Sequence, residues 1–490
     1  MLKTKLILFV SLLVVGCVNW GLRSDKKPCP EGHELNSKNV CIKSLENGVT
    51  PTPSIQVKPR PDYENLPERF TWGQRILFSS SSSPSFKLSR SGLGALESGK
   101  TLYLEGEYFE AARQFGSAYE DNENNPEPLI LYNNSLALQK DREPITLVVV
   151  VPGDNKPKHA AEILRGVAQA QNRFNANNRG NGNLLEVIIA NDGNSDNDIE
   201  LISETIAKDS SVLGIIGHNS SDSSLIAVDI YQDNNIAMIS PTSTSNELSN
   251  NDFDVFFRTV PNDNETGKKL AEYAKDQLEL SKVMVLYNSD SPYSRSIKSA
   301  FQGRFEEEGG NVTIKDLRRD SVIADFQELV REGSIQGVVL FPDTNNTSIA
   351  IDIAEANAEF SESERVKLLG GDSLYSPDTL SGGDENIEGL VLAVPWFRNS
   401  PDSKDFSKTA KIQWKGEVSW RTAMSYDATQ AFLKVVADDA ALSDIVQRLS
   451  NVRLSASETS GAPLEFSEGE PERDILLVRI KNSDYHLVSE

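Results

Sequence analysis

The stretch that decides the fold is Ile145–Val151, which reads Ile-Thr-Leu-Val-Val-Val-Val. An almost unbroken apolar run of this length is typical of a strand that is buried on both faces of a sheet. A helical pattern follows, in which Ile163, Val167 and Phe174 fall on one stripe. A doubly buried strand that leads into an amphipathic helix predicts the first unit of a parallel sheet covered by helices.

The same alternation continues along the chain. We expect further strands at Glu186–Ala190, Val212–Ile216, Ile236–Ile239, Val283–Tyr287, Asn311–Lys315, Val338–Phe341, Lys367–Leu369 and Leu390–Val394. We expect helices near Ile199–Ala207, Ser224–Tyr231, Gly267–Leu278 and Ser294–Glu308. So many units are too many for one sheet, and the alternation indicates helices on both faces. The predicted fold class is therefore α/β, with two doubly wound parallel-sheet lobes and a ligand cleft between them.

The first residues of the chain have the proportions of an export signal. A basic start precedes the apolar run Leu6–Val15, which is too short to cross a bilayer core of about 30 Å. The run ends in Val-Val-Gly-Cys, which resembles a bacterial lipobox with Cys17 as the lipidated residue. Ordinary signal cleavage, or an uncleaved anchor extended to Trp20, is the alternative. We expect a lipoprotein signal peptide over residues 1–17 and a periplasmic protein held at the membrane by a lipid anchor.

Three cysteines occur in the chain, and lipidation of Cys17 would leave Cys29 and Cys41. Two cysteines at this spacing are expected to form a local disulfide in an oxidising compartment. A zinc site with His33 is the alternative, but it lacks a fourth ligand of soft type, so we predict no metal.

Residues 18–85 are expected to form a segment with this cysteine pair and a proline- and serine-rich linker. Its run of serines, Ser79–Ser83, is typical of a flexible loop. The preceding stretch Phe70–Phe78 is apolar enough to dock on a neighbour.

Residues 86–142 have a helical pattern that resembles one and a half tetratricopeptide repeats; a plain helical hairpin is the alternative. So few helices cannot bury a core alone, so we expect them to pack on a neighbour. Within them, Gly94–Thr101 reads GALESGKT and fits the phosphate-binding pattern G-x-x-x-x-G-K-[ST]. No apolar strand precedes it, so we expect no P-loop and no nucleotide cofactor.

The net charge of the chain limits the classes of partner that it is expected to bind. The chain has 49 basic and 72 acidic residues, a net charge of −23. Such a chain repels nucleic acid and anionic lipid surfaces, so neither is expected as a main partner. The four histidines show no metal-ligand spacing, no G-x-S-x-G motif occurs, and no cysteine lies beyond residue 41. We therefore expect no catalytic residues and no cofactor.

Several segments resemble a known family, the type I periplasmic binding proteins. They are Ile216–Ser221 (IGHNSS), Tyr231–Thr244 (YQDNNIAMISPTST), Phe257–Pro261 (FRTVP), Trp420–Ala428 (WRTAMSYDA) and Gly461–Phe466 (GAPLEF). The resemblance is to the leucine/isoleucine/valine-type amino-acid-binding proteins of ABC importers. The combination with a short repeat-like helical segment is similar to cyanobacterial members.

The resemblance implies a binding domain over residues 143–490. Lobe 1 would comprise about residues 145–262 and 394–476, and lobe 2 about residues 263–393 and 477–490. Such a protein is expected to capture a small polar ligand, an amino acid or related amide, and to deliver it to an ABC permease. The alternative is a sensor or interaction protein that signals through the helical segment.

By the same resemblance, Ser221 and Thr244 bind the carboxylate of an amino acid, and the backbone carbonyl of Thr242 meets its ammonium group. These residues follow predicted strands, where hydroxyls and free N–H groups can hold an anion. The alternative is that they only cap helices.

Asp372 follows a predicted strand and matches an acidic residue that would pair with the ammonium group; the alternative is a helix cap. Tyr293 matches a tyrosine that faces the ligand, and Asp343 is a second acidic candidate. Two features depart from the family pattern. Residues 152–158 lack an aromatic residue that often covers the ligand, and residues 341–344 replace a tyrosine-bearing turn.

Overall fold

The computed structural model describes residues 33–35, 41–43, 63, 68–139, 143–178, 182–250, 253–436 and 445–488. The chain forms two units, residues 1–54 and residues 55–490. In the first unit, strands β1 (His33–Leu35) and β2 (Cys41–Lys43) pair antiparallel. The predicted lipidation of Cys17 and the predicted disulfide concern side chains outside the described part of the chain.

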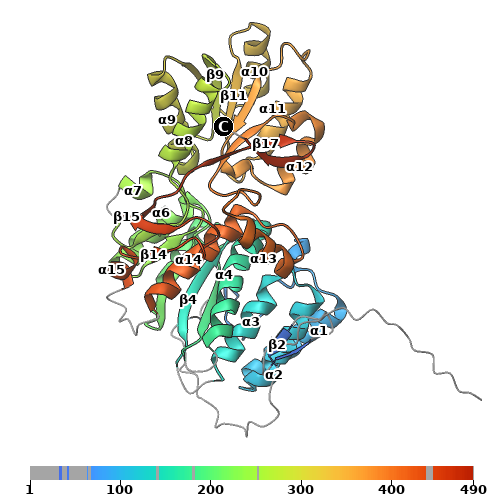
Figure 1. The fold of residues 1–490 in the computed structure, drawn as a ribbon, viewed down its shortest axis with the longest axis vertical. Helices are drawn as coiled ribbons and strands as arrows, with labels where there is room; N and C mark the ends of the chain where they lie inside the picture. The colour runs from blue at the N-terminus through green and yellow to red at the C-terminus, as the bar shows by residue number, and fades with distance from the viewer. Residues whose placement is uncertain are drawn as a thin grey trace, which may run out of the picture. The chain divides into compact units, whose positions relative to one another are not determined.

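The second unit contains a six-stranded sheet, which we call lobe 1 together with its helices (Figure 1). Strands β4 to β8 are parallel, and β3 is antiparallel to β5. In order across the sheet they are β3 (Phe70–Thr71), β5 (Leu185–Asn191), β4 (Ile145–Val151), β6 (Val212–Ile216), β7 (Met238–Ser240) and β8 (Phe256–Arg258).

Both faces of this sheet are covered, which explains the unbroken apolar run in β4. Val149 belongs to the core shared with α4 and α14, whereas Val150 belongs to the core shared with α5 and α6. Alternate residues of a strand point to opposite faces, so a strand covered on both sides needs apolar residues throughout. The four helices are α4 (Pro157–Asn178), α14 (Trp420–Val436), α5 (Asp196–Ala207) and α6 (Ser221–Asp233).

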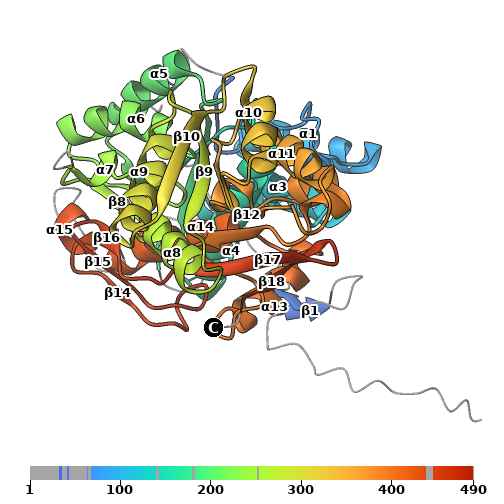
Figure 2. The same cartoon turned by 90° about the horizontal axis from the view of Figure 1, so that it is seen from above.

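A seven-stranded sheet with its helices forms lobe 2 (Figure 2). Its order is β10 (Asn311–Asp316), β9 (Lys282–Tyr287), β11 (Gly337–Phe341), β12 (Lys367–Gly370), β13 (Val391–Val394), β17 (Leu476–Lys481) and β18 (Asp484–Leu487). The first five are parallel, and the last two are antiparallel additions. One face packs on α8 (Asp263–Asp276) and α9 (Pro292–Glu307), and the other on α10 (Val322–Arg331) and α11 (Ser348–Ala358). The predicted α/β fold with two doubly wound lobes is confirmed.

The remaining described elements are short or lie at the ends of the sheets. They are η2 (Pro84–Phe86), α7 (Glu247–Asn250), η3 (Asp372–Leu374), α12 (Pro377–Gly383), η4 (Asp384–Ile387), α13 (Lys404–Trp414), α15 (Ile445–Leu449), β14 (Arg453–Leu454), β15 (Leu464–Ser467) and β16 (Glu470–Pro471). Among the described helices, none is both long and apolar enough to cross a membrane.

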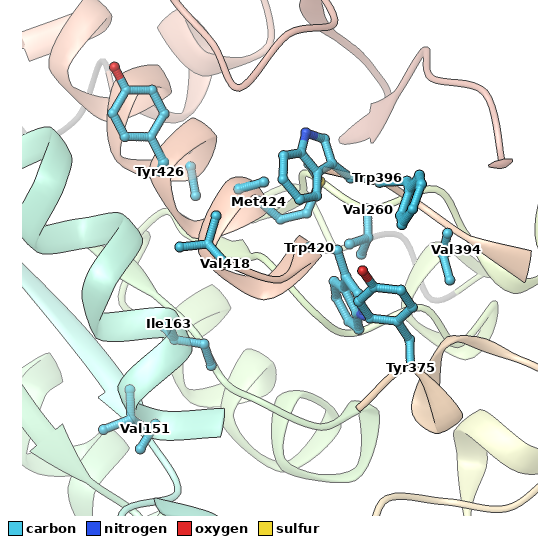
Figure 3. Packing of buried hydrophobic residues seen from close by; sticks show 14 of the residues in the cluster. Val151, Ile163, Val260, Tyr375, Val394, Trp396, Val418, Trp420, Met424 and Tyr426 are labelled. Atoms are coloured by element: carbon cyan, nitrogen blue, oxygen red, sulfur yellow. The ribbon is translucent and has the colours of Figure 1, made fainter. Parts of the chain in front are cut away.

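The chain passes between the two lobes three times, at residues 259–262, 395–403 and 472–475. Val260 and Trp396 lie in these segments and are buried in the same apolar cluster as Trp420 of α14 (Figure 3). The Trp396 indole also donates a hydrogen bond to the Ser460 carbonyl oxygen at 3.1 Å. The first two crossings are therefore packed into an apolar core that both lobes share.

Helices α1 (Arg90–Leu104), α2 (Tyr108–Asp121) and α3 (Pro126–Ala137) precede the first long strand, and α3 packs on α4 and β5. The prediction that these helices rest on a neighbour is confirmed, while their likeness to tetratricopeptide repeats stays a prediction. The P-loop-like stretch Gly94–Thr101 lies wholly inside α1. It forms no loop between a strand and a helix, as the sequence predicted.

The last part of the predicted linker, which was expected over residues 18–85, is packed on lobe 1 and is not a flexible spacer. Phe70 lies in the lobe 1 sheet, and Phe78 stacks on Phe86 with ring centroids 4.4 Å apart. Ser83 is buried and caps η2, so the serine run ends in ordered packing. The aromatic residues dock on lobe 1, as their apolar character suggested, and they hold the serines between them in place.

Candidate functional site

A cleft of about 240 Å³ lies between the lobes at the carboxyl ends of the parallel strands. Both lobes and the first residues of α14 contribute to its lining, and none of the described lining residues is aliphatic. They are Asn194, Asp196, Asn219, Ser220, Ser221, Asp222, Ser223, Thr242, Asn288, Asp290, Ser291, Tyr293, Asp343, Thr344, Asn345, Asn346, Asp372, Ser373, Trp420 and Arg421.

The lobe 1 wall is built on the start of α6. Ser220 is the N-cap, and its hydroxyl accepts a hydrogen bond from the Ser223 N–H at 3.1 Å. Ser221 is the first helical residue, and its Oγ accepts from the Ser245 N–H at 3.1 Å. Thr242 donates to the Asn219 carbonyl oxygen at 2.7 Å. The first N–H groups of a helix have no intrahelical partner, so this wall presents donors and a positive helix end to the cleft.

One buried donor in this wall has no hydrogen-bond partner within the described chain. Asn219 lines the cleft, and its Nδ2 is unpaired. Thr244 is not among the lining residues and is only 4% exposed. It lies beside Asp263, whose backbone N–H donates to the Thr244 carbonyl oxygen at 2.9 Å. Burial raises the pKa of Asp263 to about 8, against the opposing effect of the Ser296 and Thr244 hydroxyls.

The lobe 2 wall carries a carboxyl group that follows β12. Asp372 is 6% exposed, and its Oδ1 accepts a hydrogen bond from the Tyr293 hydroxyl at 2.9 Å. Burial raises the pKa of Asp372, and the positive charge of Arg421 acts against this shift. Burial, with the nearby charge of Asp372, also raises the pKa of Tyr293. The tyrosine therefore stays a neutral donor that orients the carboxylate.

Asp343 follows β11 and is held by three donors. Its Oδ2 accepts from Asn288 Nδ2 and from Asn346 Nδ2, each at 2.6 Å, and its Oδ1 accepts from the Asn345 N–H at 2.7 Å. These neutral donors fix the carboxylate without cancelling its charge.

Asp222, in the first turn of α6, was not singled out by the sequence. Burial raises the pKa of Asp222 to about 6, and the charges of Asp343 and Asp196 add to this shift while Arg295 opposes it. Asp222 stands next to Ser221 at the start of the helix, so its position in the sequence could have revealed it.

Arg421 also lines the cleft. The sequence pointed to it only within Trp420–Ala428, a segment that resembles the family. Its guanidinium group is buried and lies 4.4 Å from the centre of the Trp420 ring. One of its nitrogens lies 3.5 Å from Glu162 Oε2. Stacking on Trp420 and this ion pair hold the arginine in place at the cleft.

A buried polar chain supports the turn below the lobe 1 wall. His218 Nδ1 lies 2.7 Å from Asp192 Oδ2, and its Nε2 lies 3.1 Å from the Tyr231 hydroxyl. All three side chains are fully buried, and His218 does not line the cleft. The histidine therefore braces the turn that leads into α6.

Sequence comparison places this architecture in a family. Residues 156–484 match the family described as periplasmic binding protein. The chain belongs to the periplasmic binding protein family. This is a family of periplasmic solute-binding proteins rather than of enzymes. Among the described residues of this member, no group of three or more His, Cys, Asp or Glu side chains is arranged to hold a metal ion.

Curated relatives of this periplasmic binding protein include amino-acid-binding proteins. The Leu/Ile/Val-binding protein of Escherichia coli K12 is 22% identical over 345 residues, which cover 68% of this chain and 89% of that protein. The leucine-, isoleucine-, valine-, threonine- and alanine-binding protein of Pseudomonas aeruginosa is 26% identical over 305 residues, covering 62% of this chain and 80% of that one.

Solved structures show the same fold. A leucine-binding protein from Thermotoga maritima has a TM-score of 0.62 at 19% identity and covers 70% of this chain and 98% of its own. A solute-binding protein of an ABC transporter from Rhodopseudomonas palustris, solved with benzoate, has a TM-score of 0.59 at 14% identity and covers 70% and 95%.

The cleft of this family member brings most of the predicted site residues together. Ser221 and Thr242 line it from lobe 1, and Tyr293, Asp343 and Asp372 line it from lobe 2. Thr244 lies behind the lining. Their contact with a ligand stays a prediction, as does the division of the binding domain at the predicted lobe boundaries.

Contacts between the lobes lie beside the cleft. Lys156, just before α4, donates a hydrogen bond to the Thr344 carbonyl oxygen at 2.8 Å, and Lys158 pairs with Asp378 of α12. Arg295 of α9 pairs with Glu247 of α7 at 2.9 Å. These polar contacts join the two lobes, and opening of the cleft would break them.

Proposed function

We propose that this protein captures a free amino acid, or a related amide, between its lobes and delivers it to the permease of an ABC importer. The observation that carries the proposal is the opposite chemistry of the two walls. Lobe 1 presents the start of α6 with Ser221, while lobe 2 presents the Asp372 carboxyl group oriented by Tyr293.

This pairing fits the two ends of a zwitterion. The α-carboxylate would take hydrogen bonds from the N–H groups and hydroxyls at the start of α6, where the helix dipole also favours an anion. The α-ammonium group would pair with Asp372, which has no ion pair within 4 Å in the described chain. A ligand that binds one lobe at each end stabilises closure of the cleft.

The relatives support an amino acid as the ligand class, because those with curated names bind Leu, Ile and Val. The Rhodopseudomonas palustris protein was solved with benzoate, an acid that has no ammonium group. The fold alone therefore does not determine the ligand, and Asp372 is the residue that favours an amino acid here.

We also propose that the protein works in the periplasm, anchored through Cys17.

A thermal-shift screen of the purified protein against the common L-amino acids, amides, urea and simple carboxylic acids tests the proposal. A ligand that binds only the folded state stabilises it by RT ln(1 + [L]/Kd), about 2.7 kcal/mol at 100 times Kd. We expect at least one L-amino acid to raise the melting temperature. Stabilisation by carboxylic acids without any response to amino acids would contradict the proposed function.

A further inference from the structure

We infer that the ligand is an amino acid with a second positive charge on its side chain, held between Asp222 of lobe 1 and Asp343 of lobe 2. Lysine, ornithine and arginine are of this class. The inference rests on the proposed function, which accounts for the α-carboxylate and the α-ammonium group, and it names the side chain that the rest of the cleft would accept.

The side chains that line the cleft are mostly polar. Among the described lining residues none is aliphatic, and Tyr293 and Trp420 are the only aromatic ones. A branched aliphatic side chain would strip water from carboxyl and amide groups and gain little buried apolar area in return. The cleft therefore disfavours the side chains that the curated relatives bind.

Negative charge exceeds positive charge in the cleft. Arg421 is the one cation among the described lining residues, and its ion pair with Glu162 already compensates it. Asp290 is compensated in the same way by its ion pair with Arg318. Besides Asp372, which the proposed function assigns to the α-ammonium group, three lining carboxyl groups remain, and none of Asp196, Asp222 and Asp343 forms an ion pair with a described residue.

Asp222 and Asp343 belong to opposite lobes and line the same cleft. The charge of Asp343 contributes to the raised pKa of Asp222, which is the expected effect of a nearby like charge. Lys156 also feels the charge of Asp343, but its ammonium group donates to the Thr344 carbonyl oxygen. A cation between Asp222 and Asp343 would replace repulsion across the cleft by attraction to both lobes.

A separate observation favours an amino acid over a simple diamine as the ligand. Asn219 lines the cleft and is only 4% exposed, yet its Nδ2 donates to no group in the described chain. A buried amide donor calls for an acceptor. It lies in the same wall as the start of α6, where the α-carboxylate is expected.

Calorimetric titration of the full chain with L-arginine, L-lysine, L-leucine, L-glutamine and agmatine tests the inference. We expect arginine or lysine to bind at least tenfold more tightly than leucine, and agmatine to bind more weakly than arginine because it lacks the carboxylate. Asp222→Asn should lose about tenfold to 100-fold in affinity for the basic ligand, the value of a hydrogen bond to a charged group. Its affinity for glutamine should be unchanged.

The matched control is Asp229→Asn. Asp229 lies two turns along α6 and is exposed, so its replacement should alter no affinity. Circular dichroism of each variant establishes that it is folded.

The possible results separate the inference from the proposed function. If leucine or glutamine binds more tightly than arginine and lysine, the inference is wrong and the proposed function stands. If a basic amino acid binds but Asp222→Asn loses no affinity for it, the assigned contact is wrong. If agmatine binds as tightly as arginine, or no amino acid binds to folded protein, both the inference and the proposed function fail.

Discussion

At the scale of single residues, the central position is Asp372. Removing its side chain leaves the ammonium group of a bound amino acid unpaired in a closed cleft, which costs about 3–5 kcal/mol. Asp372→Ala should therefore bind the amino acid found in the screen roughly 150-fold to 4,000-fold more weakly.

Calorimetric titration after a folding check by circular dichroism measures this loss. Thr244→Ala is the comparison and should cost less, because Thr244 lies behind the lining and backbone N–H groups would still hold the carboxylate. If Asp372→Ala binds the ligand as tightly as the wild type does, then another group, such as Asp343, binds the ammonium group, or the ligand has no ammonium group.

Asp263 gives a prediction on pH. Burial raises the pKa of Asp263 to about 8 from 3.8, so between these values the folded state binds more protons than the unfolded state. The free energy of unfolding therefore falls as pH rises through this window, by up to about 1.4 kcal/mol per pH unit for one proton, and the effect ends above pH 8.

In Asp263→Asn this contribution should be absent. Urea unfolding from pH 5 to pH 9 should show the stability of the wild type falling relative to the variant as pH rises. A constant difference between the two proteins across this range would show that Asp263 has an ordinary pKa in the folded state.

The sequence placed five of six predicted ligand residues at the cleft because each follows a strand of a parallel sheet, and such ends meet at one edge. It could not show that Asp222 and Asp343 line the same cleft, since they lie far apart in the chain and on different lobes. Nor could it show that Thr244 turns behind the lining, because that depends on its packing beside Asp263.

At the scale of elements, the start of α4 links the lobes. The hydrogen bond from Lys156 to Thr344 is half-buried, whereas the pair of Lys158 and Asp378 is exposed on both sides. Exposed ion pairs contribute about 0–1 kcal/mol, and a hydrogen bond from a charged donor contributes more.

Lys156→Met should weaken ligand binding about threefold to tenfold by making closure less favourable, and Lys158→Met by less than about threefold. Stopped-flow dissociation should show the larger effect in Lys156→Met as faster release. Equal effects in both variants would contradict the importance given to the buried contact.

The junction between α3 and β5 also depends on one side chain. Asn134 donates to the Val187 carbonyl oxygen at 2.8 Å and accepts from the Val187 N–H at 2.9 Å, beyond the end of the short strand β3. It therefore satisfies the backbone of the sheet edge where strand pairing stops.

Asn134→Leu should lower the free energy of unfolding by at least about 2 kcal/mol, because it leaves buried Val187 groups without partners. Urea denaturation measures the loss. A change below about 0.5 kcal/mol would indicate that water replaces the amide.

The strands of the two sheets were predictable because apolar runs between helical patterns mark doubly covered strands; β4 and β6 have the predicted bounds. Strand β3 was not predicted, since it has two residues and no periodicity that could mark it. Its pairing depends on the edge that β5 offers.

At the scale of the whole molecule, the N-terminal helices are packed on lobe 1 through α3. Helix α3 is an integral part of lobe 1 packing, and Glu127 at its start accepts hydrogen bonds from the Leu77 and Phe78 N–H groups. This agrees with a structural role for the helices. Signalling through them stays an alternative prediction that the genes beside this one would help to decide, since permease and ATPase genes favour import.

The proposed lipid anchor is testable by cell fractionation. Cys17→Ser should move the protein from the membrane fraction to the soluble periplasmic fraction, because stable anchoring requires the several acyl chains of a mature lipoprotein. Wild-type protein found in the soluble fraction would contradict the lipobox interpretation.

We propose that the cleft holds an amino acid with its carboxylate on lobe 1 and its ammonium group on lobe 2. A crystal structure of the complex with the amino acid that gives the largest thermal shift tests this most directly. We predict the α-carboxylate within about 2.7–3.1 Å of donors at the start of α6 and the α-ammonium group at the same range from Asp372. A ligand outside the cleft, or one whose ammonium group does not contact Asp372, would contradict this mode of binding.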